Sequence, residues 1–141
     1  MAIGWLARRE HSCAEVVAKL GRKGCSPPIA AAVAAALAAE GYLSEERLAE
    51  VVARSRRRRG YGPMRIRKEL VQKGLTDDAI ERWSDARSKE WLADVKRVLH
   101  QKFGSDRPSN YAERAKRARF LQQRGFTFEQ IQQALSTRAV D

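Results

Sequence analysis

A short motif that is typical of a helix end occurs three times in this chain, and it constrains the fold more than any other feature. The motif is L-x-x-[KR]-G, and its copies are Leu20–Gly24, Leu70–Gly74 and Leu121–Gly125. Each copy is followed by an apolar or thiol residue and then by Ser or Thr. A glycine just after a helix tolerates the left-handed conformation, and a hydroxyl side chain then caps the next helix. Ordinary helix punctuation explains one copy, but steps of 50 and 51 residues predict an internal repeat.

The sequence around the three copies predicts an all-α chain of three tandem three-helix repeats. Apolar residues recur at spacings of three and four, as on one face of a helix, and no window alternates with the period of two that is typical of a strand. We place the repeats at 1–41, 42–86 and 87–141. Because each repeat in such a chain contacts mainly its neighbours, we expect an elongated, curved helical protein.

Hydroxyl, glycine and proline residues mark where the helices are expected to begin. Ser12 is followed three residues later by Glu15, which is the arrangement of a capping box. The other expected helix starts are Ser44, Thr76 and Thr127 as hydroxyl N-caps, Pro27 and Pro28 in a first turn, and Gly62 with Pro63 as N-cap and first helical residue. The stretch 77–103 contains no Gly or Pro, so it fits either one long helix or two with a bend near Asp85. A closing helix pair is expected at 111–124 and from 127 to about 138.

The residues expected to face the core follow helical spacing. They are Ile29, Val33, Leu37, Leu48, Val51, Val52, Ser55, Ile66, Leu70, Ile80, Trp83, Trp91, Val95, Leu99, Phe103, Phe120, Leu121, Phe126, Ile131 and Leu135. Cys25 stands where the other two copies of the motif have Leu75 and Phe126. We therefore expect Cys25 to be a buried small hydrophobe and not a reactive thiol.

Several classes of function are disfavoured by what the chain contains. There is no phosphate-binding loop of the Walker type, and Ser/His/Asp or Cys/His catalysis would have to use His11 or His100. His11 lies near Cys13, but we interpret the two as ordinary residues at a helix start, and we expect no enzyme, cofactor or metal site. The longest apolar run is Ile29–Ala39, which is too short to span a bilayer. Reduced thiols are favoured over a single disulfide, and with no signal peptide in the first ten residues we expect a cytoplasmic protein.

Positive charge is concentrated in one central block. Residues 54–73 hold nine Lys or Arg and one acidic residue, Glu69, so this block alone carries +8 of the total of +11. Residues 1–53 are net neutral, with six basic and six acidic residues. A charge placed in this way usually has a polyanion or an acidic protein as its partner.

A basic face is repeated in the second and third repeats. A shift of 51 residues aligns Arg65 with Lys116 and Lys68 with Arg119, and the first repeat lacks half of this pattern. We expect Arg54, Arg57 and Arg58 to lie together beside this face, on the side of their helix opposite to the core. An ordinary solvated face is the alternative, but the coincidence of sign and position favours a binding surface. Its candidate residues are Arg54, Arg57, Arg58, Arg65, Lys68, Lys73, Lys116, Arg119 and Arg124.

Each helix–Gly–helix segment superficially resembles a helix-turn-helix DNA reader. In such a reader the first turns of the second helix contact bases and phosphates. Here those turns are 26–29, 76–79 and 127–130, none of them is basic, and Asp77 with Asp78 would be repelled by the duplex. Sequence-specific DNA recognition through these helices is therefore not expected.

Four blocks, in this order, make the chain similar to the RecX family of RecA regulators along nearly its whole length. They are LARREHS at 6–12, EGYLSEER at 40–47, RGYGP at 59–63 with IRKELVQKG at 66–74, and RFLQQRGF at 119–126. The resemblance implies tandem three-helix repeats and a non-enzymatic protein. It also implies binding in the helical groove of the RecA–DNA filament, with inhibition of filament growth, recombination, ATP hydrolysis and co-protease activity in the SOS response. The family motifs consist of core and turn residues, so they name no binding site. The alanine-rich helix after Pro28 and the thiol at Cys25 depart from the family pattern without affecting a functional feature.

Two hypotheses of different classes follow. The first is a regulator that binds the RecA filament, also touches single- or double-stranded DNA weakly and without sequence preference, and acts as a monomer. The alternative is a general sequence-independent nucleic-acid-binding protein that uses the same basic helices. Few free aromatic side chains are expected for stacking bases, which favours the first hypothesis.

Overall fold

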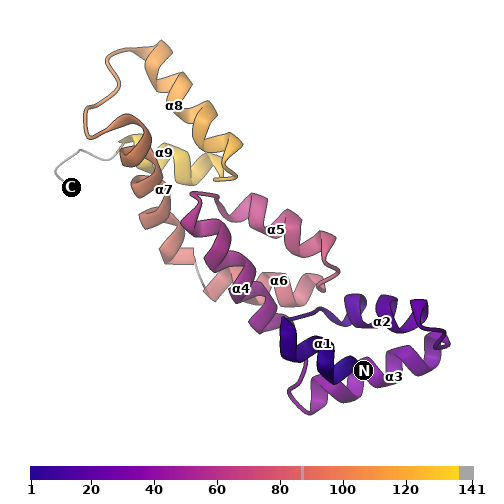
Figure 1. Ribbon diagram of the computed structural model, residues 1–141. Helices are drawn as coiled ribbons and strands as arrows, with labels where there is room; N and C mark the ends of the chain where they lie inside the picture. The colour runs from indigo at the N-terminus through magenta and orange to yellow at the C-terminus, as the bar shows by residue number, and fades with distance from the viewer. Residues whose placement is uncertain (87, 137–141) are drawn as a thin grey trace. The chain divides into compact units, whose positions relative to one another are not determined.

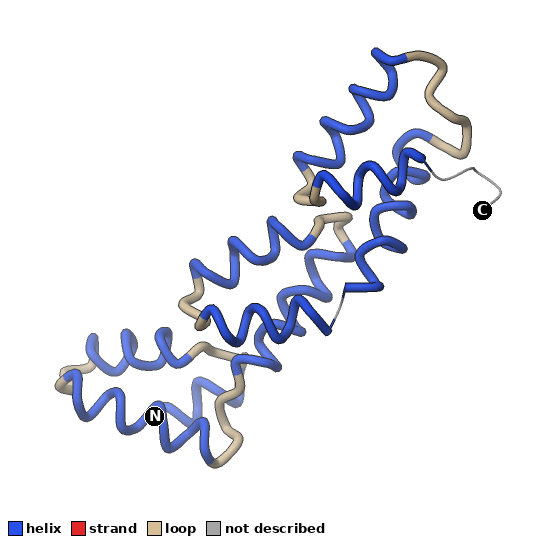
Figure 2. The backbone as a smooth tube through the Cα atoms, turned by 180° about the vertical axis from the view of Figure 1, so that it is seen from behind, coloured by secondary structure: helices blue, strands red, loops and turns tan. Residues whose placement is uncertain are grey.

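The chain is all-α, as the sequence predicts. The computed structural model describes residues 1–86 and 88–136, and within these ranges it contains nine helices and no strand (Figures 1 and 2). The helices are α1 (Ala2–Arg8), α2 (Cys13–Arg22), α3 (Pro27–Ala39), α4 (Glu45–Arg58), α5 (Pro63–Gln72), α6 (Asp77–Ala86), α7 (Ser88–Phe103), α8 (Tyr111–Gln123) and α9 (Phe128–Ser136). They form three tandem three-helix repeats, α1–α3, α4–α6 and α7–α9.

By its internal contacts the chain divides into two compact units. Unit 1 comprises Met1–Ala53 with Glu69–Trp83, and unit 2 comprises Arg54–Lys68 with Ser84–Asp141. The core of unit 1 contains the buried residues Val16, Leu20, Ala30, Ala34, Leu37 and Leu43. The core of unit 2 contains Val95, Val98, Leu121, Phe126, Ile131, Ala134 and Leu135. Cys25 packs against the core of unit 1 as a small apolar residue would, but it is half-buried and not fully buried as predicted.

The three copies of the repeated motif adopt one geometry. The motif glycines have φ angles of +96°, +88° and +98° in chain order, which is the left-handed region that glycine tolerates best. In each copy the N–H of the residue after glycine donates to the carbonyl of the motif leucine, with N···O distances of 3.0, 3.2 and 3.2 Å. This is the bond of a Schellman motif. The three leucines are buried, so the predicted helix ends are confirmed.

The predicted caps are also present. The Ser12 side chain accepts from the Glu15 N–H while the Glu15 carboxylate accepts from the Ser12 N–H, so the capping box is complete. The hydroxyls of Ser44, Thr76 and Thr127 each accept a hydrogen bond from the N–H three residues later. The stretch 77–103 forms two helices, α6 and α7, and the predicted end of the last helix near residue 138 lies outside the described residues.

The predicted inward faces of α3 and α4 are wrong by part of a turn. Ile29 and Val51 were expected in the core, but they are 58% and 54% exposed. The stretch 27–39 is almost entirely apolar, so its spacing could not select a face, and α3 buries the small residues Ala30 and Ala34 together with Leu37. In α4 the buried side chains are Leu48, Ala49, Val52 and Ala53. In both helices alanines form part of the core and allow a neighbouring helix to pack closely. The prediction was based on large apolar side chains and therefore missed these alanines.

A glycine turn meets a helix start in both units. In unit 1 the turn after α5 lies against the start of α2, where the Ser12 hydroxyl donates to the Lys73 carbonyl. In unit 2 the turn after α8 lies against the start of α5, where the Gly62 N–H donates to the Arg124 carbonyl at 2.6 Å and the Met64 N–H donates to the Gly125 carbonyl at 2.8 Å. Figures 1 and 2 both show the end of α8 beside the start of α5. Each repeat after the first is therefore joined at this turn to the repeat before it.

Candidate functional site

The two units have opposite net charge. Unit 2 contains 20 Lys or Arg and 7 Asp or Glu in its sequence, a net charge of +13. Unit 1 contains 8 basic and 10 acidic residues, a net charge of −2. All of the excess positive charge of the chain thus belongs to unit 2, which contains eight of the nine candidate site residues.

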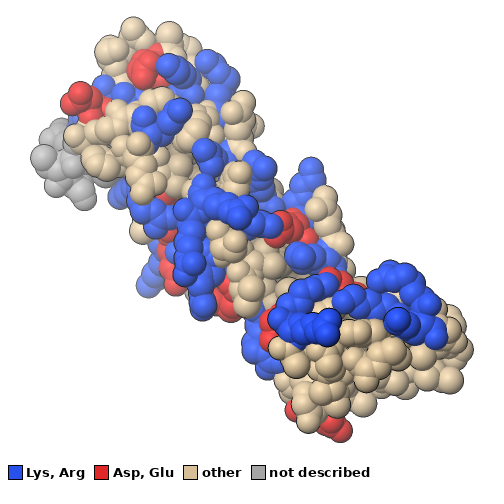
Figure 3. Space-filling view, in the orientation of Figure 1, with Lys and Arg blue, Asp and Glu red and all other residues tan. Residues whose placement is uncertain are grey.

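Five of the candidate residues are open cations. Each is exposed and makes no ion pair or hydrogen bond with another residue of 1–86 or 88–136. The open cations are Arg54 and Arg58 on α4, Lys68 on α5, and Lys116 and Arg119 on α8. Figure 3 shows Lys and Arg side chains gathered over the α4–α5 turn. Because their charges are not neutralised by close protein partners, these residues are available to an acidic ligand.

Two further candidates, Arg65 and Arg124, contact an aromatic ring that is not among the residues predicted for the site. The Tyr61 ring contacts both Arg65 and Arg124, whose guanidinium carbons lie 4.1 and 5.2 Å from the ring centroid. Arg124 also donates from Nη1 to the Arg59 carbonyl at 3.0 Å. These contacts fix the direction of both guanidinium groups, and each keeps N–H groups for a ligand. The Gly60–Tyr61–Gly62 sequence was the available signal, because the left-handed Gly60 (φ +84°) ends α4 and sets the direction of Tyr61.

Arg57 does not lie on an open face beside Arg54 and Arg58, which corrects the expected helix side. Its Nε donates to Asp94 Oδ2 at 2.6 Å, its Nη2 to Asp94 Oδ1 at 3.1 Å, and its Nη1 to Glu90 at 3.0 Å. The Asp94 side chain is only 3% exposed. The hydrogen bonds to Asp94 raise the pKa of Arg57. The Arg57 side chain therefore joins α4 to α7 through Asp94, a carboxylate on the inner face of α7. The spacing of apolar residues did not predict a carboxylate at that place.

Lys73 belongs to unit 1, whereas the other eight candidates belong to unit 2. It is half-buried at the turn against the start of α2, where its charge helps to lower the pKa of Glu15. The largest influences on this carboxyl are burial, which raises its pKa, and the hydrogen bond from Ser12, which lowers it.

The His11 ring has hydrogen-bonding partners other than the nearby Cys13. The buried His11 ring has Nδ1 3.0 Å from the Arg9 carbonyl and Nε2 2.9 Å from Lys19 Nζ, so neither nitrogen is paired with Cys13. Burial raises the pKa of the Cys13 thiol, which disfavours the thiolate. Among the described residues no group of three His, Cys, Asp or Glu is placed to hold a metal ion. None of the helices in 1–86 and 88–136 is long and apolar enough to cross a membrane.

Comparison with known proteins identifies the family. Residues 1–37, 44–82 and 90–135 match the family models described as the first, second and third three-helix domains of RecX. The chain belongs to the RecX family. It is 42% identical over 140 residues to "Regulatory protein RecX" of Halorhodospira halophila, a match that covers 99% of this chain and 87% of the relative. It is 40% identical over 140 residues to the protein of the same name from Pseudomonas fluorescens Pf-5, with coverage of 99% and 90%.

Solved RecX structures share the fold. The crystal structure of RecX from Lactobacillus salivarius superposes with a TM-score of 0.80 at 19% identity, covering 95% of this chain and 89% of the other. A second RecX structure has a TM-score of 0.72 at 16% identity and is covered to 68%. The resemblance to RecX proposed from the sequence motifs is thus confirmed.

Proposed function

We propose that this RecX-family chain is a non-enzymatic regulator that acts in the cytoplasm, binds the RecA–DNA filament in its helical groove and inhibits RecA. The inhibited activities would be recombination, ATP hydrolysis and co-protease action in the SOS response. Support comes from membership of a family whose relatives are named regulatory proteins. The observation that carries the proposal is the difference in net charge between the units, +13 for unit 2 and −2 for unit 1. A filament of acidic protein surfaces around a phosphate-bearing strand suits unit 2, whose cations are arranged to meet negative charge.

The open cations are expected to make the contacts. Lys116 and Arg119 on α8, and Lys68 on α5, occupy the repeated basic positions, and α8 ends against the start of α5. Arg54 and Arg58 extend this basic set on α4. Single exposed ion pairs contribute only about 0–1 kcal/mol each, so the binding energy must come from several of them together.

The test is RecA ATPase activity on single-stranded DNA with this protein titrated in. We expect inhibition at protein concentrations well below those that coat the DNA. Inhibition that appears only when the DNA is saturated by the protein would favour the sequence-independent nucleic-acid-binding alternative. No inhibition at any concentration would refute the proposed function.

Charge-reversal variants in the two units locate the surface. The quadruple variant Arg54→Glu, Arg58→Glu, Lys116→Glu and Arg119→Glu should weaken inhibition strongly, and circular dichroism should show an unchanged helix content because all four side chains are exposed. The control changes the exposed unit 1 cations Arg8, Arg22 and Lys23 to glutamate and should inhibit normally. Loss of inhibition in the control, with normal inhibition by the folded quadruple variant, would show that the surface is assigned to the wrong unit.

A further inference from the structure

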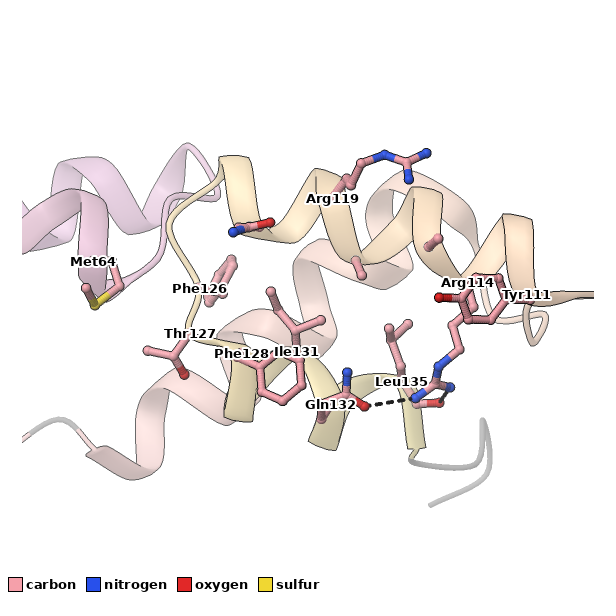
Figure 4. Close-up of a pocket in the computed structure, with 13 residues that line it drawn as sticks. Met64, Tyr111, Arg114, Arg119, Phe126, Thr127, Phe128, Ile131, Gln132 and Leu135 are labelled. Carbon is pink, nitrogen blue, oxygen red and sulfur yellow. Dashed lines mark hydrogen bonds between the residues drawn. The ribbon is translucent and has the colours of Figure 1, made fainter.

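A groove between α8 and α9 is lined mainly by apolar side chains and belongs entirely to unit 2. Its volume is about 680 Å³. Ala115 and Ala118 of α8 line it together with Ile131 and Leu135 of α9, and Figure 4 shows the side chains of Ile131 and Leu135 on α9. At one end Arg114 joins the two helices, because its Nη2 donates to Gln132 Oε1 at 3.2 Å and its Nη1 to the Leu135 carbonyl at 3.3 Å. Met64 lies at the other end.

Large apolar side chains at the edges of this groove are exposed. Tyr111 is 84% exposed, Phe128 is 78% exposed and Met64 is 53% exposed. Scattered apolar residues on a surface need no explanation, but three around one apolar groove mark an interaction site. Tyr111 and Phe128 each stand at the first position of a helix, outside the apolar stripe, so no core-packing role accounts for them.

The charge of the lining defines the partner. Two of the thirteen lining residues are arginines, Arg114 and Arg119, and none of the thirteen is acidic. Arg119 is also one of the open cations, so the groove continues into the basic surface of unit 2. A ligand that fits must therefore combine an apolar face with negative charge beside it.

We propose that the groove binds an amphipathic helix whose polar face is acidic, presented by the protein subunits of the partner filament. The helix would bury its apolar face against the exposed side chains of Tyr111, Phe128 and Met64 and direct its carboxylates toward Arg119. This is the mode in which an apolar groove receives helix side chains at spacings of three and four. The helix α8, which forms one wall, has 13 residues and is about 20 Å long at 1.5 Å per residue, a length that a partner helix of three to four turns matches. The assignment rests on the proposed function because it takes the helix from the filament that this chain regulates.

A single nucleic-acid strand fits the groove less well. Stacking of bases requires flat aromatic platforms along a positively charged track. Three aromatic residues line this groove, but Phe126 is only 3% exposed. Tyr111 and Phe128 are therefore the only rings in the lining that a base could reach, and the other apolar residues of the lining carry no ring. Of the five open cations only Arg119 lines the groove, so phosphates would be better bound outside it.

The test places a photo-crosslinker in the groove of the full chain. The benzophenone amino acid p-benzoylphenylalanine replaces Phe128, and in a control chain it replaces Ala112, which is exposed on α8 but does not line the groove. Each protein is irradiated on RecA filaments assembled on single-stranded DNA, and the crosslinked peptides are sequenced. We expect the Phe128 position, and not the Ala112 position, to crosslink to a helical RecA segment rich in Asp and Glu. In parallel, Phe128→Asp should weaken filament binding about tenfold, because it replaces an apolar contact by a charge that repels an acidic helix, and leave affinity for bare DNA unchanged.

The outcomes separate this assignment from the proposed function. If the unsubstituted chain inhibits RecA but position 128 crosslinks to DNA, to a segment without excess acidic residues, or to nothing, the groove assignment is wrong and the proposed function stands. Normal filament binding by Phe128→Asp would overturn the assignment in the same way. If the unsubstituted chain does not inhibit RecA, the proposed function fails, and the assignment fails with it.

Discussion

Replacing Gly125 with alanine tests whether the turn after α8 joins the second and third repeats. Gly125 has φ +98°, and a Cβ added there would lie 2.6 Å from the Arg65 Cβ and 2.8 Å from the Arg65 nitrogen. Gly24 has the same role in the first repeat, with φ +96°, but a Cβ added there meets nothing within 4 Å. The pair Gly24→Ala and Gly125→Ala therefore shares one backbone cost and differs only in the contact with a neighbouring repeat.

The two costs can be separated by magnitude. An L-residue held in the left-handed region costs about 1–2 kcal/mol, and this applies to both variants. Gly125→Ala must also displace the start of α5, which adds about 1–3 kcal/mol as overpacking usually does. We expect a loss of unfolding free energy of about 1–2 kcal/mol for Gly24→Ala and about 2–5 kcal/mol for Gly125→Ala in urea titrations followed by circular dichroism.

Amide hydrogen exchange provides the local readout. The N–H groups of Gly62 and Met64 are at a helix start, where such groups lack intrahelical partners, and they donate instead to carbonyls of the α8 turn. They should exchange slowly in the unsubstituted chain and in Gly24→Ala, and fast in Gly125→Ala. Equal losses of stability in the two variants, with unchanged protection at Gly62 and Met64, would refute the inferred junction.

Three other changes have defined outcomes. Leu70→Ala should cost about 2–5 kcal/mol of unfolding free energy because this leucine is fully buried, whereas Val71→Ala, at an exposed neighbour, should change it little. Arg57→Met should cost about 2–4 kcal/mol of unfolding free energy because it leaves the buried Asp94 carboxylate without its main partner. Adding Asp94→Leu should restore most of this free energy in the same urea titration. A double variant as unstable as the single one would contradict this. Burial lowers the pKa of His11, so its contribution to stability is fully present above about pH 6.5, the unfolded value, and is lost as the pH falls toward the folded pKa. The unfolding free energy should therefore rise between pH 5 and pH 7.5, and His11→Gln should flatten that rise; an equal rise in the variant would exclude His11 as its source.

The helix ends could be predicted because they depend on local chemistry. A hydroxyl, a glycine or a proline fixes the backbone within a few residues, so Ser12, Thr76 and Gly125 identified their turns without knowledge of the core. The faces of α3 and α4 could not be predicted in full. In α3 nearly every position is apolar, and the choice of Ala30 over Ile29 is made by how closely another helix can approach. The repeat boundaries at 41/42 and 86/87 remain a prediction.

The sequence predicted the positive charge of the candidate site better than it predicted which basic side chains are exposed. The sign and spacing of Lys68, Lys116 and Arg119 follow from the repeat, and the structure leaves all three exposed. Arg57 has the same charge but is bound by Asp94, a residue 37 positions later in the chain. Helical spacing records which residues share a side of one helix, whereas the ion pair depends on which helix lies opposite. A basic residue can therefore be assigned to a binding surface only after its carboxylate neighbours are known.

The basic residue of the repeated motif illustrates how one position acquires different roles. Lys73 and Arg124 precede the second and third motif glycines, and the carbonyl of each accepts a hydrogen bond from the start of a helix in the preceding repeat. Lys23 precedes the first motif glycine, whose turn has no neighbour within 4 Å of an added Cβ, and Lys23 is exposed. Where the turn is docked, the side chain is half-buried and positioned against the adjacent repeat, as Arg124 is by Tyr61 and Arg59. The repeated motif thus specifies the same turn in all three copies. Contact with a preceding repeat then determines whether the Lys or Arg before the glycine is a solvated charge or part of a junction between repeats.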